Sequence, residues 1–141
     1  MKPLKLLALF VIPLGIIIAA VPPDRVKHFR LTADELLQEA GAGVQFVSPD
    51  VVADMLVQKD PSLRLIDVRT PEEFDAYHME GAINIPLSSL LSDEYTDILN
   101  QEAYMNVFCS NGSVYANQAW MITRQLGYEN NFVLEGGLNY W

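Results

Sequence analysis

The sequence predicts a single α/β domain built on a parallel sheet, and two observations predict it. Short apolar segments typical of buried strands alternate along the chain with segments that have the start signals of helices. The chain has 141 residues, half of them hydrophobic and only 19% charged, so it is long and apolar enough for one folded core. This composition also excludes a disordered chain.

Five short strands are expected, each apolar and bounded by turn or cap residues. They are residues 44–47, 63–68, 82–86, 105–109 and 131–135. One helix is expected before the first strand, beginning after Thr32 and ending at Gly41 and Gly43. Between the strands, helices are expected to begin at Pro49, to run from Pro71 to about Tyr77, to form pieces over 87–99, and to span 115–126, where Gly127 ends the helix. A last helix is expected to begin at Gly136 and Gly137.

Three of these helices have clear N-terminal caps. In each, a Ser or Thr is followed by a Pro at the first helical position, by a Glu three residues on, or by both. The caps are Thr32 with Glu35, Ser48 with Pro49, and Thr70 with Pro71 and Glu73.

The charge and the cysteine content exclude several classes of function. Lys and Arg total 9 and Asp and Glu total 18, which gives a net charge of −9 without a basic cluster. Nucleic-acid binding is therefore not expected, because phosphate contacts need a concentrated positive face. The single cysteine, Cys109, excludes an intramolecular disulfide, a four-cysteine zinc site and a CxxC redox pair. The acidic cluster of Asp93, Glu94 and Asp97 lacks the spacing of a metal site.

The N-terminal region has the layout of an export signal. Lys2 and Lys5 precede an uncharged, largely apolar run that reaches Pro23. We expect residues 1–23 to be a signal peptide or an uncleaved membrane anchor, with membrane association through residues 4–21. Residues 24–43 are then a helical linker and residues 44–141 the domain. The expected location is the periplasm of a bacterium, or its membrane with the domain facing the periplasm.

Cys109 is the residue whose side chain could act as a nucleophile. It ends a predicted strand, and ligands bind at the carboxyl ends of strands in open parallel sheets. The following loop contains Gly112 and leads into a helix, so its amides and the helix dipole favour an anion there. We therefore expect the pKa of Cys109 to lie below the free-thiol value of about 8.5. The local pattern fits a buried structural cysteine equally well.

Several motifs together resemble the rhodanese-like domain over roughly residues 44–141. They are Asp67-Val68-Arg69, Pro71 with Glu73 and Phe74, His78 with Gly81-Ala82 and Asn84-Ile85-Pro86, Cys109 with Gly112, Gly127-Tyr128, and Glu135-Gly136-Gly137 with Trp141. The resemblance implies a five-stranded parallel sheet flanked by helices on both faces.

It also implies a sulfurtransferase in which Cys109 carries sulfane sulfur as a persulfide. The donor is a small sulfur compound such as thiosulfate, and the acceptor is cyanide or a thiol. The amides of the loop form the sulfur cradle, and no metal or organic cofactor is implied. The loop residues concerned are Ser110, Asn111, Gly112, Ser113 and Val114.

The chain departs from the family pattern in the same loop. Many members have an Arg where this chain has Ser113 or Val114, and that Arg can help bind an anionic donor. Arg69 is a further candidate for donor binding, although an ion pair with Asp67 is the commoner role for such residues. His78 is expected to be a structural hydrogen-bonding residue rather than an acid or base.

Two other functions compete with sulfur transfer. A non-catalytic rhodanese-like module that binds a partner or senses sulfur species is compatible with the missing loop Arg. A phosphatase of the related kind needs an Arg six positions after the cysteine, where this chain has Tyr115. A phosphoryl dianion would then lack its bidentate partner and would be poorly held, which argues against a phosphatase.

Overall fold

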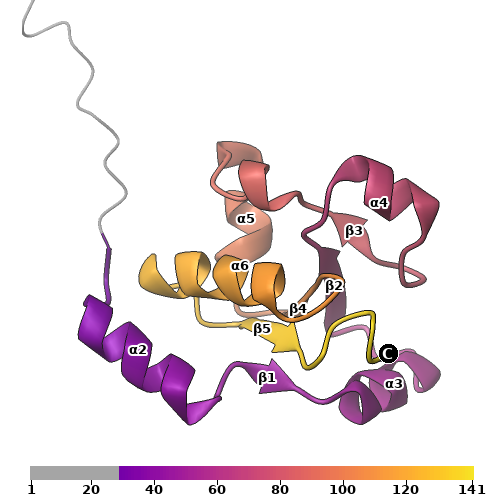
Figure 1. Cartoon of the computed structure of the whole chain (residues 1–141), viewed down its shortest axis with the longest axis horizontal. Helices are drawn as coiled ribbons and strands as arrows, with labels where there is room; N and C mark the ends of the chain where they lie inside the picture. Colours follow the sequence, from indigo (N-terminus) through magenta and orange to yellow (C-terminus); the bar gives the residue numbers. More distant parts are fainter. Residues whose placement is uncertain (1–28) are drawn as a thin grey trace, which may run out of the picture.

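The computed structural model describes residues 29–141 (Figure 1). The predicted signal or anchor at residues 1–23 and the start of the predicted linker lie outside the described residues. Five parallel strands form one sheet with the order β1-β5-β4-β2-β3. The strands are β1 (Phe46–Val47), β2 (Leu63–Asp67), β3 (Ile83–Asn84), β4 (Met105–Cys109) and β5 (Asn131–Leu134).

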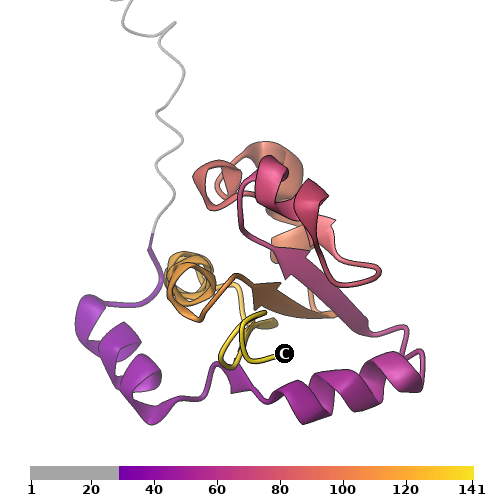
Figure 2. The same ribbon diagram turned by 45° about the vertical axis from the view of Figure 1, so that its right-hand side comes forward.

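Helices lie on both faces of this sheet, as predicted. They are α2 (Ala33–Ala42), α3 (Pro49–Val57), α4 (Pro71–Ala76), α5 (Thr96–Leu99) and α6 (Val114–Gln125), with 3₁₀ turns η1 (Leu87–Ser89) and η2 (Asp93–Tyr95). Figure 2 shows α3 on one side of the sheet and α5 and α6 on the other. The three predicted caps are present, with Thr32, Ser48 and Thr70 each accepting a hydrogen bond from the amide three residues on.

The sheet separates two apolar cores because successive side chains of a strand point to opposite faces. On β4, Phe108 faces α6 and packs with Trp120, whereas Val107 and Cys109 face α3 and pack with Val52. We call these the α6-side core and the α3-side core. The α3-side core consists of Val47, Val52, Leu65, Met79, Val107, Cys109 and Leu134.

The helix predicted within the linker packs against the domain. Leu36 of α2 is buried in the α6-side core. Glu39 accepts two hydrogen bonds from the Arg124 guanidinium of α6, at 2.6 and 2.8 Å. The amide of Arg30 also donates to the carbonyl of Gln125 at 2.8 Å. Helix α2 is therefore fixed to α6 by apolar and polar contacts together.

The predicted last helix is wrong. Residues 135–140 form turns instead, and both Gly136 and Gly137 have a positive φ, of 73° and 62°. A right-handed helix needs negative φ at these positions. The amides of Leu138 and Asn139 donate to the loop after Cys109 rather than to a preceding helical turn. We call residues 136–141 the C-terminal segment.

Candidate functional site

The site lies at the carboxyl ends of the two central strands. The chain runs outward from β2 to β3 on one side and from β4 to β5 on the other, so the topology reverses between β2 and β4. Ligand crevices of open α/β sheets form at such reversals. Asp67 and Cys109 are register partners at these two strand ends, and the amide of Val68 donates to the Cys109 carbonyl at 3.0 Å.

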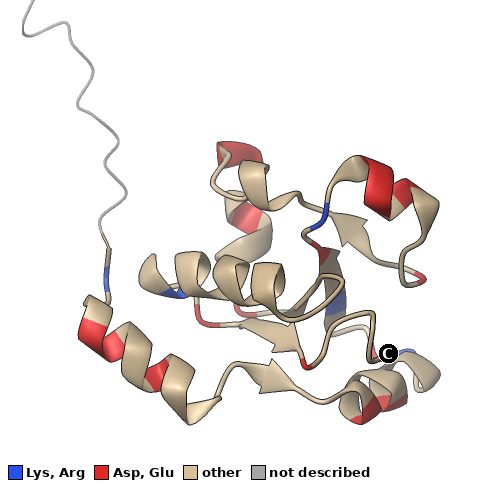
Figure 3. Ribbon diagram, in the orientation of Figure 1, with Lys and Arg blue, Asp and Glu red and all other residues tan. Residues whose placement is uncertain are grey.

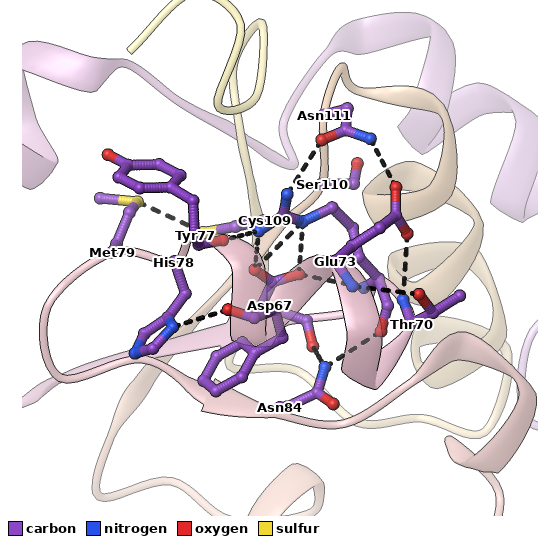
Figure 4. A network of polar contacts seen from close by, with 12 residues as sticks. Asp67, Thr70, Glu73, Tyr77, His78, Met79, Asn84, Cys109, Ser110 and Asn111 are labelled. Carbon is purple, nitrogen blue, oxygen red and sulfur yellow. Dashed lines mark hydrogen bonds and ion pairs between the residues drawn. The ribbon is translucent and has the colours of Figure 1, made fainter.

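The Cys109 side chain is buried beneath the surface of this edge. Only 1% of the residue is exposed, and its thiol lies in the α3-side core. Sγ contacts the carbonyl oxygen of Val107 at 3.6 Å. It also contacts Sδ of Met79 at 3.9 Å (Figure 4). In this conformation the thiol is covered by protein rather than presented to solvent.

The expectation of a lowered thiol pKa is wrong for this conformation. Burial and, less strongly, the nearby Asp67 carboxylate together raise the pKa of Cys109 to about 12, and Arg69 opposes them more weakly. The sequence around Cys109 indicates the loop amides and the helix dipole, but it does not indicate that folding removes water from around the sulfur. Desolvation disfavours the thiolate and is the largest of these effects.

The loop after Cys109 is closed on itself and held by the C-terminal segment. The Ser110 hydroxyl donates to the Gly112 carbonyl and accepts from the Ala116 amide at 3.2 Å. The amides of Leu138 and Asn139 donate to the carbonyls of Ser110 and Asn111, both at 2.8 Å. The Ser113 hydroxyl accepts from the Gly136 amide at 3.0 Å. The carbonyls of Ser110, Asn111 and Gly112 thus all accept hydrogen bonds from the protein.

The loop amides are the groups predicted to cradle sulfur. Val114 and Tyr115 begin α6, and the first amides of a helix have no partner within it. Within residues 29–141, the amides of Gly112, Ser113 and Val114 donate to no protein acceptor. They are therefore available to an anion, and their role as a cradle stays a prediction.

Arg69 connects three parts of the site. Its guanidinium forms a buried ion pair with Asp67, with Nη2 to Oδ2 at 2.6 Å. It also donates to Asn111 Oδ1 at 3.0 Å and to the Tyr77 carbonyl at 2.7 Å. The structural role anticipated for the Asp67 and Arg69 pair is confirmed. Donor binding by Arg69 would require it to leave at least one of these partners.

The remaining polar residues support the loops around the site. His78 Nδ1 lies 2.8 Å from the Phe74 carbonyl, and its ring stacks on that of Phe74, which confirms a structural role. Glu73 contacts the loop through its Oε1, which accepts from Asn111 Nδ2 at 2.9 Å. Asn84 Nδ2 donates to the carbonyls of Asp67 and Arg69, both at 3.0 Å.

Met79 is the site residue that the sequence prediction missed. Its side chain is 4% exposed and contacts the thiol, although it lies in a turn of otherwise polar and exposed residues. The available signal was a single apolar residue between His78 and Gly81.

A pocket of about 300 Å³ also opens beside the strand ends, and Arg69, Glu73, Leu87 and Tyr115 are among the residues that line it.

Comparison with known proteins agrees with this geometry. Residues 48–141 match the Rhodanese-like domain. The chain belongs to the rhodanese-like domain family. It is 32% identical over 118 residues to the probable adenylyltransferase/sulfurtransferase MoeZ of Mycobacterium tuberculosis, covering 84% of this chain and 29% of that protein. It is 31% identical over 81 residues to the thiosulfate sulfurtransferase GlpE of Tolumonas auensis, covering 57% of this chain and 74% of GlpE.

Solved structures give the same assignment. A human single-domain sulfurtransferase superposes with a TM-score of 0.57 at 28% identity, covering 69% of this chain and 94% of that one. A rhodanese-like domain from Anabaena superposes with a TM-score of 0.61 at 25% identity, covering 69% and 72%. The chain spans less than a third of the length of MoeZ, so the activity of that whole protein is not carried over. Within residues 29–141, no helix is long and apolar enough to cross a membrane.

Proposed function

We propose that this protein is a sulfurtransferase in which Cys109 carries the transferred sulfur as a persulfide. The observation that carries the proposal is the position of Cys109, at the carboxyl end of β4 where the sheet topology reverses. The unpartnered amides at the start of α6 supply donors for an anionic sulfur. The sulfurtransferase names of GlpE and MoeZ support the same activity.

Two displacements make up the proposed reaction with thiosulfate. The Cys109 thiolate attacks the outer sulfur of thiosulfate, the sulfur–sulfur bond of thiosulfate breaks, and sulfite leaves with its electron pair. Cyanide or a thiolate then attacks the outer sulfur of the persulfide. The bond between the two sulfurs breaks, and Cys109 leaves as a thiolate. The loop amides would stabilise the negative charge on the persulfide and on this leaving thiolate.

A non-catalytic module that binds a partner or senses sulfur species is the second candidate. The burial of the thiol and the lack of an Arg at Ser113 or Val114 favour it. The two candidates differ in turnover, because a sensor retains the sulfur that an enzyme passes on.

Mass spectrometry of the protein after thiosulfate or polysulfide treatment separates these functions. We expect a gain of one sulfur atom on Cys109 that disappears when cyanide is added, with thiocyanate formed over many turnovers. Cys109→Ser should fold and show neither event, and urea-unfolded protein is a control for unspecific sulfuration. A stable adduct without turnover would indicate the sensing module, and a folded protein without any adduct would overturn both sulfur transfer and sulfur sensing and would favour a partner-binding module.

We also propose that residues 1–23 direct the domain out of the bacterial cytoplasm. The support is the sequence pattern alone, Lys2 and Lys5 followed by an apolar run. Fractionation of cells expressing the full chain and a variant that begins at residue 29 tests this. We expect the full chain in the membrane or periplasmic fraction and the shortened one in the cytoplasm. An uncleaved full chain found only in the cytoplasm would contradict the proposal.

A further inference from the structure

The thiol of Cys109 cannot accept a sulfur atom in the direction of Met79 while that side chain stays in place. Sγ of Cys109 and Sδ of Met79 are 3.9 Å apart. A sulfur–sulfur bond is about 2.05 Å long, so a sulfur added on this line would lie about 2 Å from Sδ. That separation is far inside van der Waals contact. Either Met79 moves or the sulfur enters from another side.

The other residues of the α3-side core, in which the thiol lies, are held firmly. Val47, Val107 and Leu134 belong to hydrogen-bonded strands of the sheet, and Val52 belongs to α3. The C-terminal segment also contributes Leu138, whose amide donates to the Ser110 carbonyl at 2.8 Å while its neighbour binds the Asn111 carbonyl. Moving any of these residues breaks backbone hydrogen bonds or strand packing.

Met79 is held much less firmly. In the described stretch from Pro71 to Gly81 it is the only buried residue, so one side chain anchors an exposed turn. The start of this turn is held by the hydrogen bond from Arg69 to the Tyr77 carbonyl, and its end by that from the Ala82 amide to the Met79 carbonyl. Segments with few buried apolar contacts open at low free energy.

There is also space beside this turn. A pocket of about 270 Å³ lies between the end of α3 and the turn, lined by Met55, Leu56 and Leu65 on one side and by Glu80 and Gly81 on the other. Glu80 and Gly81 directly follow Met79, and Leu65 belongs to the same core as Met79. A flexible, unbranched Met side chain can therefore leave the thiol without unfolding the sheet.

From these contacts we propose that Met79 is the gate of Cys109. Donor and acceptor reach the thiol through the space that the Met79 side chain fills in the closed state. This proposal rests on the proposed sulfur transfer at Cys109. The experiments measure alkylation of the thiol instead of sulfur transfer, so that the gate and the transfer reaction can fail separately.

The first measurement uses the wild-type chain. Iodoacetamide is small and neutral, and its reaction with Cys109 is followed by mass spectrometry at urea concentrations below the unfolding transition. A local gate predicts a labelling rate that is almost independent of urea, because opening exposes little surface. A rate that rises from the lowest urea with the full slope of global unfolding would overturn the gate, since the thiol would then be reached only in unfolded protein.

The second measurement compares variants without urea. Met79→Ala should be alkylated about tenfold or more faster than wild type, because the cover over the thiol is removed. Met79→Leu restores an apolar cover and should stay close to the wild-type rate. Leu138→Ala, which removes another apolar side chain that packs against the same core, is the matched control and should change the rate much less than Met79→Ala.

Two results among these variants would overturn the proposal. One is an equal acceleration by Leu138→Ala and Met79→Ala, which would show a general loosening of the core. The other is a folded Met79→Ala protein that reacts at the wild-type rate. If Met79→Ala does not fold, the dependence of wild-type labelling on urea decides alone.

Discussion

At the scale of single residues, the Asp67 and Arg69 pair decides how the site is held together. Arg69 is 7% exposed and Asp67 1%, so each charge depends on the other for compensation. Hydrogen bonding to Asp67 raises the pKa of Arg69, so the guanidinium stays charged. Through Asn111 and the Tyr77 carbonyl it also links the loop after Cys109 to the turn that carries Met79. The Arg69 side chain thus holds both the loop and the turn in place beside Cys109.

Replacing Arg69 should therefore be costly. Arg69→Met leaves the Asp67 carboxylate buried without a partner, and such losses destabilise proteins by about 3–5 kcal/mol. Arg124→Met is the matched control, because the Arg124 and Glu39 pair is 22% and 31% exposed. A pair that is partly exposed contributes about 1 kcal/mol or less. Urea unfolding of both variants measures the difference, and equal losses would contradict the role assigned to Arg69.

The buried thiol predicts a loss of stability at high pH. The pKa of Cys109 is about 12 in the folded chain, against a usual value for a free thiol of about 8.5. Well below pH 8.5 both states hold the proton and the full stability is present. Above it the unfolded chain loses the proton first, so the free energy of unfolding falls, by at most about 1.4 kcal/mol per pH unit.

Comparison with Cys109→Ser isolates this contribution from other groups that titrate at high pH. The difference in free energy of unfolding between the two proteins should be constant well below pH 8.5, the pKa of a free thiol, and should shift against the wild type as the pH rises through about that value. Urea unfolding at pH 7 to 11 measures it. A difference that does not change with pH would show that the thiol titrates normally in the folded chain.

At the scale of secondary structure, local signals predicted most of the elements. The caps at Thr32, Ser48 and Thr70 depend on contacts within four residues, and strand β4 was predicted with its observed bounds. The site was predictable as far as Cys109 and its loop, because both are contiguous in the sequence. The cover by Met79 was not, because that contact joins residues 30 positions apart. The C-terminal turns were missed for the same reason, since their amides bind a loop far back in the chain.

Gly137 is the position where the C-terminal segment and the loop after Cys109 meet most closely. A Cβ there would lie 2.5 Å from the carbonyl oxygens of Ser110 and Gly112, which are backbone atoms that cannot move aside alone. Gly81 also has a positive φ, of 80°, but a Cβ there meets nothing within 4 Å. Alanine substitutions at the two glycines therefore distinguish the cost of backbone strain alone from the cost of strain with a steric clash.

Gly81→Ala should cost only the strain of a left-handed residue, about 1–2 kcal/mol. Gly137→Ala should cost clearly more and should detach the C-terminal segment from the loop. Urea unfolding gives the two free energies, and hydrogen exchange of the Leu138 and Asn139 amides reports the detachment. Equal costs, with both amides still protected in Gly137→Ala, would contradict the close contact.

At the scale of the whole molecule, charge would affect which sulfur donors reach the proposed site. The chain has a net charge of −9, and four of its basic residues precede residue 29, so the described part is more acidic still. Figure 3 shows acidic residues on helices on both faces of the sheet and few basic ones. The Arg69 charge next to Cys109 is already paired with Asp67. The field around the site therefore repels a dianion such as thiosulfate.

This repulsion predicts that salt accelerates the reaction with thiosulfate. Raising the ionic strength from about 0.01 M to 0.15 M shortens the screening length from about 30 to 8 Å, so the repulsion between protein and dianion weakens. We expect the second-order rate of sulfur loading on Cys109 to rise a few fold with sodium chloride. Alkylation by neutral iodoacetamide is the control and should hardly change. A loading rate that falls with salt would show instead that a positive group, with Arg69 released from Asp67 as the nearest one, attracts the donor to the site.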